Sequence, residues 1–379
     1  MAKLGDVCEI VSGSTPNTNN ESFWNGDFCW ITPAEISDSD VVIYDTERKI
    51  TEMGVNSCAL TLMPIGTVLL SSRAPIGKVA ITGKEMYCNQ GFKNLICSDS
   101  IFNKYLFYFL KNNNKYLNSL GRGATFKEIS KKIVSDIEIP LPTLETQRQI
   151  AANLDKVTHT IDLCNAILEK LDLLVKSRFV EMFGDKKYPY QELISLIIEG
   201  AGLSYGIVQP GDDGTGDMGV LRPVDIVDGS IVLDNIKFID REIASGYQKT
   251  ELTGKELLIT VRGTTGVTAV SDKRFCGMNV TRGIAVIRYD EEKINPIYLN
   301  EYLKSDESQR YIQENTRGAT LKQINLSDLR IQKILVPPLE LQQQFAAFVE
   351  QTDKSKLAVK QVLEKAETLK KALMQEYFG

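Results

Sequence analysis

The sequence predicts an α+β protein: two β-rich modules are separated and followed by two long helices, in a pseudo-two-fold internal repeat. The stretch RGATFKEI, residues 122–129, recurs as RGATLKQI, residues 317–324, with six of eight positions identical. A long segment whose apolar residues recur every three or four positions follows each copy. Strand-like runs separated by glycine-containing turns precede each copy. Together these observations indicate that one large unit occurs twice.

The repeat extends well beyond eight residues. At the same offset of 195, PTLETQRQIAANL (142–154) aligns with PPLELQQQFAAFV (337–349), and EMFG (181–184) aligns with EYFG (376–379). This spacing is far larger than the period of about 20–50 residues that is typical of solenoid repeats. We therefore interpret the pattern as duplication of a whole module with its helix.

The length of 379 residues is too great for one core and predicts two or three domains. With 43% hydrophobic residues, the chain can bury such cores. The repeat places the boundaries as follows: a first module at 1–143, a central helix at 144–184, a second module at 185–338 and a C-terminal helix at 339–379.

The two modules share a frame but differ in their loops. GTVLLSSRAPIGKVAI from Gly66 aligns with GKELLITVRGTTGVTAV from Gly254, so that Arg73 matches Arg262 and Gly77 matches Gly266. Both segments are typical of a strand, a glycine turn and a second strand. WITPAEISD from Trp30 similarly matches VLRPVDIVD from Val220, whereas the neighbouring loops have unrelated sequences. A common frame with divergent loops favours two recognition modules for different targets.

Each long segment predicts a helix with a coiled-coil seam. The first seam consists of Ile150, Leu154, Val157, Ile161, Cys164, Leu168, Leu171, Val175, Phe179 and Met182. The second consists of Phe345, Val349, Thr352, Val359, Leu363, Ala366, Leu369, Leu373 and Tyr377, with Lys356 interrupting it. Two seams of equal length favour an antiparallel coiled coil between the helices. The alternative is that each helix packs separately on its own local core.

Cysteine usage and hydropathy indicate the compartment. The seven cysteines are scattered and form no CxxC motif, so we expect free thiols in a reducing cytoplasm. The apolar runs are strand-sized and predict no membrane span, and the first residues lack the apolar core of a signal peptide.

The sequence predicts no active site, no metal site and no cofactor. His159 is the only histidine, which excludes a histidine triad and a multi-histidine metal site. No GxxxxGK[ST] loop is present to hold a nucleotide phosphate. VPPLE from Val336 lacks the acid or amide and the aromatic residue that a base-flipping methyltransferase loop uses. We therefore expect a protein without catalytic residues.

Five stretches of the sequence are informative together. They are the duplicated RGAT-K-I and P-LE-Q stretches, the segment LEKLDLLVKSRFVEMFG, the start LGDVCEIVSGSTP and the segment SSRAPIGKVAI. They resemble the specificity subunit of Type I restriction-modification enzymes. The resemblance covers essentially the whole chain. It implies two target recognition domains that bind double-stranded DNA without catalysis. The implied partners are two adenine-N6 methyltransferase subunits and, in a restriction complex, ATP-driven translocase–nuclease subunits. The alternative class is a coiled-coil scaffold that binds proteins without DNA specificity.

Candidate DNA-binding residues lie in the glycine-containing turns and in the repeated motif. Residues 1–143 contain 14 basic and 15 acidic side chains and residues 185–338 contain 19 and 22, so any DNA-binding face must be local. Arg suits guanine, and Asn or Gln suits adenine, in the major groove. The turn candidates are Arg73, Lys78, Asn89, Gln90, Lys93, Arg262, Asn279 and Arg282.

The repeated motif supplies a second group of candidates, namely Arg122, Thr125, Lys127, Arg317, Thr320 and Lys322. Both modules share these residues, so they cannot encode two different target sequences. We expect them to bind phosphates or to form a structural junction.

Overall fold

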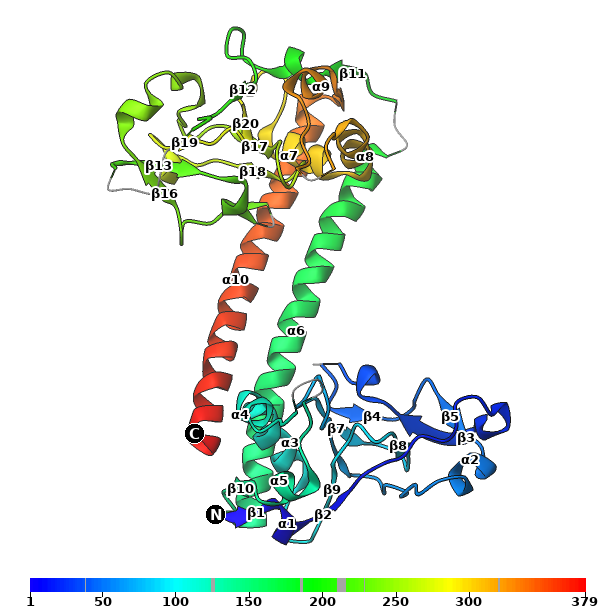
Figure 1. The fold of residues 1–379 in the computed structure, drawn as a ribbon. Helices are drawn as coiled ribbons and strands as arrows, with labels where there is room; N and C mark the ends of the chain where they lie inside the picture. The colour runs from blue at the N-terminus through cyan, green and yellow to red at the C-terminus, as the bar shows by residue number, and fades with distance from the viewer. Residues whose placement is uncertain (38, 124–126, 185–186, 210–215, 228, 320) are drawn as a thin grey trace. The chain divides into compact units, whose positions relative to one another are not determined.

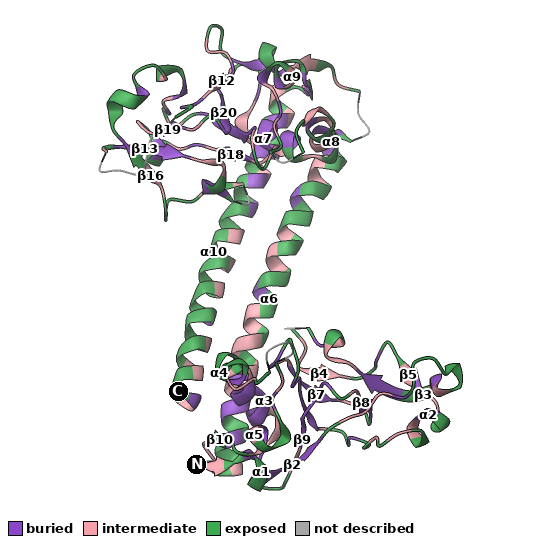
Figure 2. Cartoon of the chain, in the orientation of Figure 1, coloured by how far each residue is buried: buried purple, intermediate pink, exposed green. Residues whose placement is uncertain are grey.

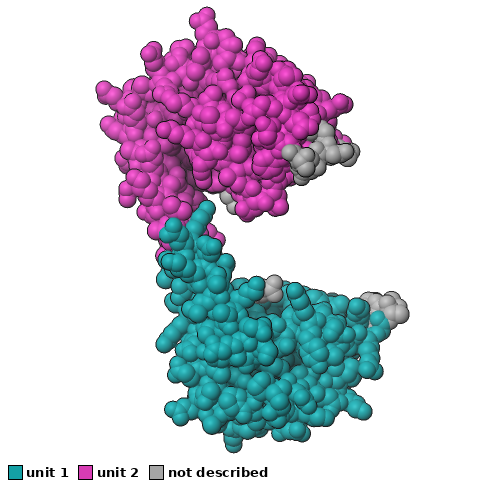
Figure 3. Space-filling view, turned by 90° about the vertical axis from the view of Figure 1, so that its left-hand side faces the viewer, with its two compact units in different colours: residues 1–165, 360–379 teal, residues 166–359 magenta. Residues whose placement is uncertain are grey.

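The computed structural model describes residues 1–37, 39–123, 127–184, 187–209, 216–227, 229–319 and 321–379. These residues form two compact units, shown in different colours in Figure 3. Unit 1 comprises residues 1–165 and 360–379, and unit 2 comprises residues 166–359. The helix α6 (Leu144–Phe183) begins in unit 1 and ends in unit 2, whereas α10 (Leu339–Phe378) begins in unit 2 and ends in unit 1.

Unit 1 contains short strands and short helices before α6 (Figure 1). Its strands are β1 (Ala2–Lys3), β2 (Cys8–Val11), β3 (Trp24–Ile31), β4 (Val42–Ile43), β5 (Lys49–Ile50), β6 (Val68–Leu70), β7 (Val79–Thr82), β8 (Tyr87–Cys88), β9 (Asn94–Cys97) and β10 (Glu138–Ile139). Its helices before α6 are α1 (Leu4–Val7), α2 (Glu52–Asn56), α3 (Asn103–Asn112), α4 (Asn114–Ser119) and α5 (Lys131–Ser135). The described strands assemble into sheets of order β2-β9-β6-β7-β4, β5-β3-β8 and β1-β10.

The central strand β6 of the five-stranded sheet is buried on both faces. Val68 and Leu70 of β6 belong to a core that also contains Tyr105 of α3 and Leu154 of α6. Leu69, between them, belongs to a second core with residues of β3. Because successive side chains of a strand point to opposite faces, β6 contacts helices on one side and the three-stranded sheet on the other. This explains why β6 is a continuous apolar run. In Figure 2 the neighbouring strand β7 is buried, whereas β4 at the edge of the sheet is half-buried.

Unit 2 repeats this arrangement. Its strands are β11 (Tyr190–Glu192), β12 (Ser204–Tyr205), β13 (Met218–Leu221), β14 (Ile226–Val227), β15 (Ser230–Ile231), β16 (Lys237–Ile239), β17 (Leu257–Thr260), β18 (Thr268–Val270), β19 (Asn279–Val280), β20 (Ile284–Ile287) and β21 (Lys333–Leu335). Its helices between α6 and α10 are α7 (Pro296–Lys304), α8 (Asp306–Asn315) and α9 (Leu326–Ile331). The described strands form sheets of order β12-β20-β17-β18, β16-β13-β19, β14-β15 and β11-β21.

The strand pairings confirm that the two units are copies of one fold. β3 pairs with β8 in parallel and with β5 antiparallel, and β13 pairs with β19 in parallel and with β16 antiparallel. The hairpin β6-β7 corresponds to β17-β18. The units differ beside this hairpin: β4 joins the sheet of unit 1 in parallel with β7, whereas unit 2 has the separate hairpin β14-β15. The predicted mixed fold with an internal repeat is therefore present.

A buried glutamine explains the repeated sequence at the start of each long helix. Gln147 accepts a hydrogen bond from the Phe102 backbone N–H at 2.8 Å and donates to the Pro142 carbonyl oxygen at 2.9 Å. Gln342 likewise accepts from the Asn295 N–H at 2.8 Å and donates to the Pro337 oxygen at 2.7 Å. Both glutamines are completely buried. The repeated P-LE-Q stretch thus joins each long helix to the loop before α3 or α7.

Aromatic residues fix the C-terminal end of each long helix. In unit 2, Phe183 of α6 packs edge-to-face on Tyr298 of α7, with ring centroids 5.0 Å apart. In unit 1, Phe378 of α10 packs on Tyr105 of α3 at 5.2 Å. The repeated phenylalanine of EMFG and EYFG therefore anchors each helix in the unit where it ends.

Most seam residues predicted from the heptad pattern are buried or half-buried. One assignment is wrong, because the Leu369 side chain is 49% exposed and the neighbouring Ala366 and Leu373 lie inward. Lys356 interrupts the apolar seam but has partners, since its Nζ lies 2.8 Å from an Asp172 oxygen and 3.3 Å from an Asp353 oxygen. Burial alone would lower the pKa of Lys356, but the two carboxylates outweigh it and raise the pKa above its usual value.

None of the helices in the described part of the chain combines the length and the hydropathy that a membrane span requires.

Candidate nucleic-acid interface

The repeated motif forms a closed loop in both units. In unit 1, Arg122 and Glu128 exchange two backbone hydrogen bonds of 3.0 Å, and the Ile129 N–H donates to the Ser72 oxygen at 2.9 Å. In unit 2, the same bonds join Arg317 to Gln323 at 2.8 Å, and the Ile324 N–H donates to the Val261 oxygen at 3.0 Å. Thr125 and Thr320 lie outside the described residues. The motif is therefore a loop that binds the end of β6 or β17.

This docking brings the loop to the turn that contains Arg73 or Arg262. Arg73 forms a backbone bridge with Glu128, and Arg262 forms the equivalent bridge with Gln323. The turns themselves are alike: the Gly77 N–H donates to the Ser71 oxygen, and the Gly266 N–H donates to the Thr260 oxygen. Gly77 and Gly266 have φ values of 90° and 88°, which favour glycine. The sequence alignment of these turns therefore holds in space.

A carboxylate distinguishes the turn of unit 1 from that of unit 2. Arg73 Nε donates to Glu128 Oε2 at 3.0 Å, and Lys93 Nζ donates to Glu128 Oε1 at 3.1 Å. Desolvation opposes ionisation of Glu128, but the two cations outweigh it and hold the pKa below its usual value. In unit 2 the neutral Gln323 replaces this carboxylate. Within the described part of the chain, no side-chain partner binds Arg262, so its charge is not neutralised by an adjacent acid.

A hollow of about 310 Å³ lies beside the Arg73 turn, and three of the predicted residues border it. Its lining consists of Thr32, Pro33, Ala34, Arg73, Ala74, Pro75, Asn89, Gln90 and Gly91. We call this hollow the turn pocket. Arg73 reaches it from the β6-β7 turn, Asn89 and Gln90 from the segment after β8, and Pro33 from the turn after β3. Thr32, Pro33 and Ala34 are not among the residues predicted from the sequence, although the match of WITP with VLRP includes this turn.

The two amides of the turn pocket are oriented by contacts within unit 1. Asn89 Oδ1 accepts a hydrogen bond from the Gly91 N–H at 2.9 Å. Gln90 Oε1 accepts from the Thr15 hydroxyl at 2.5 Å. One lone pair of the Asn89 oxygen is therefore used by the backbone, and among the described residues its NH₂ group has no protein partner.

Two predicted lysines of unit 1 hold the fold around the pocket. Lys78 Nζ donates to the Pro33 oxygen at 3.0 Å and to the Ile36 oxygen at 2.6 Å, which fixes the Pro33 turn to the hairpin β6-β7. Lys93 is buried and bound to Glu128. These contacts direct both ammonium groups toward the protein.

Backbone contacts identify the equivalent positions in unit 2. The Ser14 N–H donates to the Cys88 oxygen, and the Ile207 N–H donates to the Val280 oxygen. The carbonyl oxygens of Gly91 and Gly283 accept from the residues that precede Arg73 and Arg262, respectively. Between these fixed points, Thr281 occupies the position of Asn89, and Arg282 occupies that of Gln90. Arg282 is exposed.

Asn279 lies in the sheet and not in the turn. It occupies the position of Tyr87, is completely buried, and accepts a hydrogen bond from the Thr250 hydroxyl at 2.8 Å. Its amide nitrogen donates to the Tyr247 oxygen at 3.0 Å. This side chain has a structural role, and its burial separates it from the surface residues Arg262 and Arg282.

The remaining predicted residues lie on the loops of the repeated motif. Arg122 and Lys127 in unit 1 and Lys322 in unit 2 are exposed. Arg317 is exposed too, and its guanidinium lies 3.4 Å from an Asp328 oxygen. A surface ion pair of this kind contributes little to stability, so the cation is available to a ligand.

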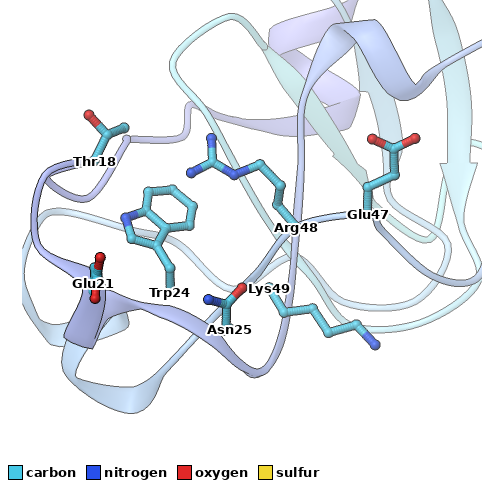
Figure 4. A pocket seen from close by; sticks show the side chains of 7 residues that line it. All are labelled: Thr18, Glu21, Trp24, Asn25, Glu47, Arg48 and Lys49. Carbon is cyan, nitrogen blue, oxygen red and sulfur yellow. The ribbon is translucent and has the colours of Figure 1, made fainter.

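A second hollow of about 310 Å³ in unit 1 is lined by Thr18, Glu21, Trp24, Asn25, Glu47, Arg48 and Lys49. Figure 4 shows the Arg48 side chain beside the Trp24 ring. The guanidinium carbon lies 3.7 Å from the ring centroid, which is a cation–π contact. Because Arg48 already covers this ring and two carboxylates border the hollow, the site is poorly suited to stack a base or bind a phosphate.

The chain matches known proteins along most of its length. A family model described as the type I restriction modification DNA specificity domain matches residues 1–173 and 214–368. The Type I restriction enzyme MjaIX specificity subunit of Methanocaldococcus jannaschii is 30% identical over 375 residues, which cover 92% of this chain and 85% of that protein.

Two solved structures have a similar fold. The S subunit of a Type-I restriction-modification system from M. genitalium gives a TM-score of 0.63 at 14% identity, covering 100% of this chain and 95% of that chain. A chain from a structure on complex assembly and conformational transition of the type I R-M system gives 0.60 at 20% identity, covering 100% and 96%. At these identities the structures support the fold, while the family model and the relative support the family. This chain therefore belongs to the specificity subunits of Type I restriction-modification systems, which recognise DNA targets.

Proposed function

We propose that this chain recognises a bipartite DNA target, with unit 1 binding one half-site and unit 2 the other, and that it is itself not catalytic. The observation that supports this most is the turn pocket. The same backbone frame occurs in both units, with Asn89 and Gln90 in one and Thr281 and Arg282 in the other. One frame with two sets of side chains suits two different half-sites.

The proposed DNA-binding residues divide into two groups. Arg73, Asn89 and Gln90 in unit 1, and Arg262 and Arg282 in unit 2, would contact bases. Arg122, Thr125, Lys127, Arg317, Thr320 and Lys322 would contact phosphates, because both units share them. Lys78 and Lys93 would hold the segments that form the pocket in place through their contacts within unit 1. Asn279 is not included, because it is completely buried.

The long helices are proposed to pair as an antiparallel coiled coil. In unit 1, Asn153 of α6 contacts the Tyr377 hydroxyl of α10 at 3.3 Å. In unit 2, Phe183 at the end of α6 packs on Phe345 near the start of α10, with ring centroids 5.6 Å apart. The start of each helix is thus near the end of the other within one unit, which is the order of an antiparallel pair.

We propose that two adenine-N6 methyltransferase subunits dock on equivalent surfaces of these helices, and that translocase–nuclease subunits join them in a restriction complex in the cytoplasm. Leu174 of α6 and Leu369 of α10 are related by the offset of 195. Their side chains are 47% and 49% exposed, respectively. Exposed leucines at equivalent positions of two helices offer one apolar contact to each of two identical partners.

The function is tested by mapping methylated adenines. The chain is co-expressed with the methyltransferase subunits of the same genome, and N6-methyladenine is located in the DNA by single-molecule sequencing. We expect two short specified segments separated by an unspecified spacer. Methylation without sequence preference, or a single uninterrupted motif, would contradict the bipartite proposal and favour a scaffold role.

Docking is tested separately with Leu174→Lys and Leu369→Lys. Each variant should release one methyltransferase subunit, and the double variant should release both, as measured by native mass spectrometry. Asn165→Lys adds the same single positive charge at an exposed position of α6 and serves as the control. Full assembly of the double variant would show that these leucines are not the contact.

A further inference from the structure

The turn pocket of unit 1 presents mainly hydrogen-bond donors. The Asn89 oxygen already accepts a hydrogen bond from the Gly91 N–H, so the group of this amide that is left without a partner is its NH₂ group. This orientation is fixed chemically, because a backbone N–H requires an acceptor and the amide nitrogen is not one. In the described part of unit 1, that NH₂ group has no protein acceptor.

Gln90 and Arg73 add donors to the same hollow. The Gln90 oxygen accepts from the Thr15 hydroxyl, which leaves its NH₂ group for a ligand. Arg73 uses Nε for Glu128, and its two terminal nitrogens remain as donors. Glu35, the nearest acid of the Pro33 turn, is bound to Thr32 and to the Glu47 N–H. The ligand of this pocket must therefore supply acceptors.

Among the base edges of the major groove, guanine fits this requirement best. Guanine presents two adjacent acceptors, N7 and O6, and no donor. Adenine places its N6 donor beside N7, and cytosine presents a donor, so either base would oppose an amide NH₂ group with another donor. Thymine offers one acceptor beside a methyl group.

A phosphate also supplies acceptors only, but two observations favour the base. Two of the three groups are neutral amides, and Arg73 is already paired with Glu128, so the pocket has little net charge for a phosphate. In addition, the amide positions differ between the units, whereas the exposed cations of the repeated loop are the same in both. A phosphate contact has no reason to differ between two half-sites, while a base contact does.

We infer that the turn pocket of unit 1 binds the N7/O6 edge of a guanine, with Asn89 and Gln90 as specificity-determining residues. Arg282, at the position of Gln90, performs the equivalent role in unit 2, where an arginine also matches a guanine edge. This inference deepens the proposed function and rests on it.

Two substitutions each replace a hydrogen-bond donor of the pocket with an acceptor and keep the oxygen that orients the side chain. Asn89→Asp keeps an oxygen for the Gly91 N–H but replaces the outward NH₂ group with an acceptor. Gln90→Glu does the same while keeping an oxygen for the Thr15 hydroxyl. Asn19→Asp is the matched control, because it introduces the same charge at an exposed position of unit 1 outside the pocket.

The test uses the complete complex with its methyltransferase subunits and the motif mapped for the wild type. Duplexes with this motif are compared with duplexes in which one guanine is replaced by 7-deazaguanine, which lacks the N7 acceptor. At one guanine of the unit 1 half-site, we expect the replacement to weaken wild-type binding by about 5- to 150-fold. The Asn89→Asp complex should not distinguish the two duplexes, while the Asn19→Asp complex should behave as the wild type does.

A variant of unit 2 shows which half-site each unit binds. Arg282→Gln should relax one position of the half-site that Asn89→Asp leaves intact. If Asn89→Asp weakens binding to all sequences equally and 7-deazaguanine has no effect, the pocket binds a phosphate and the inference is wrong. An unchanged motif and affinity in both pocket variants would likewise overturn it. A wild-type complex that methylates no bipartite motif would instead refute the proposed function, and that result is visible before any variant is made.

Discussion

The residues that are identical in both copies of the repeat have two kinds of role. Gln147 and Gln342 are internal supports, since their side-chain amides satisfy backbone groups at the start of each long helix. Arg122 and Lys127 are exposed and make the loop of the repeated motif cationic. The sequence shows the same degree of repetition for both kinds. Only burial separates them.

The buried glutamine leads to a stability prediction. Gln147→Ala leaves the Phe102 N–H and the Pro142 oxygen without partners in a dry environment, so we expect a loss of about 1–3 kcal/mol in the free energy of unfolding of unit 1. Chemical denaturation of the full chain, followed by circular dichroism, measures it. Gln149→Ala, at an exposed site two residues away, should change the free energy by less than about 0.5 kcal/mol. Equal effects of the two substitutions would argue against the anchoring role.

Glu128 gives unit 1 a pH-dependent contact that unit 2 lacks. The pKa of Glu128 is lower in the folded protein than its usual value, so its ionised form stabilises the folded state. This contribution is complete above the usual pKa of about 4.5 and is lost as the pH falls through the lowered value. We expect Glu128→Gln to flatten this part of the profile of melting temperature against pH. Glu138→Gln, at an exposed site, should preserve the wild-type slope.

Among the elements, the long helices show how a polar residue is accommodated in an apolar seam. Lys356 lies where the heptad pattern requires an apolar side chain, and it is mostly buried between Asp172 and Asp353. A polar group at a seam position favours the alignment of the helices that gives it a partner. We therefore propose that the ion pair favours one register of α6 and α10 within unit 2.

Reversing this charge should loosen the seam. Lys356→Glu places three carboxylates together, and we expect a loss of about 1–3 kcal/mol in the unfolding free energy of the full chain. Lys354→Glu makes the same charge change at an exposed position of α10 and should have little effect. Combining Lys356→Glu with Asp172→Lys should recover part of the loss. No recovery would mean that the pair does not set the register.

At the scale of the whole molecule, the chain consists of two copies of one fold, each completed by both long helices. Unit 1 includes the end of α10, and unit 2 includes the end of α6. The boundaries predicted from the sequence place each helix in a segment of its own. The difference arises because Phe183 and Phe378 bury their rings in the unit where each helix ends.

The duplicated organisation predicts that specificity can be exchanged by halves. Replacing residues 185–338 with the equivalent module of a related specificity subunit should change one half of the methylated motif and leave the other unchanged. Residues 1–143, with the turn pocket of unit 1, are untouched by this exchange. Mapping of methylated adenines measures the outcome, and a change in both half-sites would show that the units do not recognise DNA independently.

The sequence alone determined the repeat, the two long helices and the equivalence of the Arg73 and Arg262 turns, because periodicity and repetition are local properties of a chain. It also gave the resemblance to the family to which the chain belongs. The tertiary structure decided the environment of each candidate residue, which depends on contacts between distant segments. It buried Asn279 in a strand, bound Lys93 to Glu128, and brought Asn89 beside Pro33 and Arg73. It also oriented the Asn89 amide, because the Gly91 N–H that it binds needs an oxygen, and no residue pattern in the sequence specifies that choice.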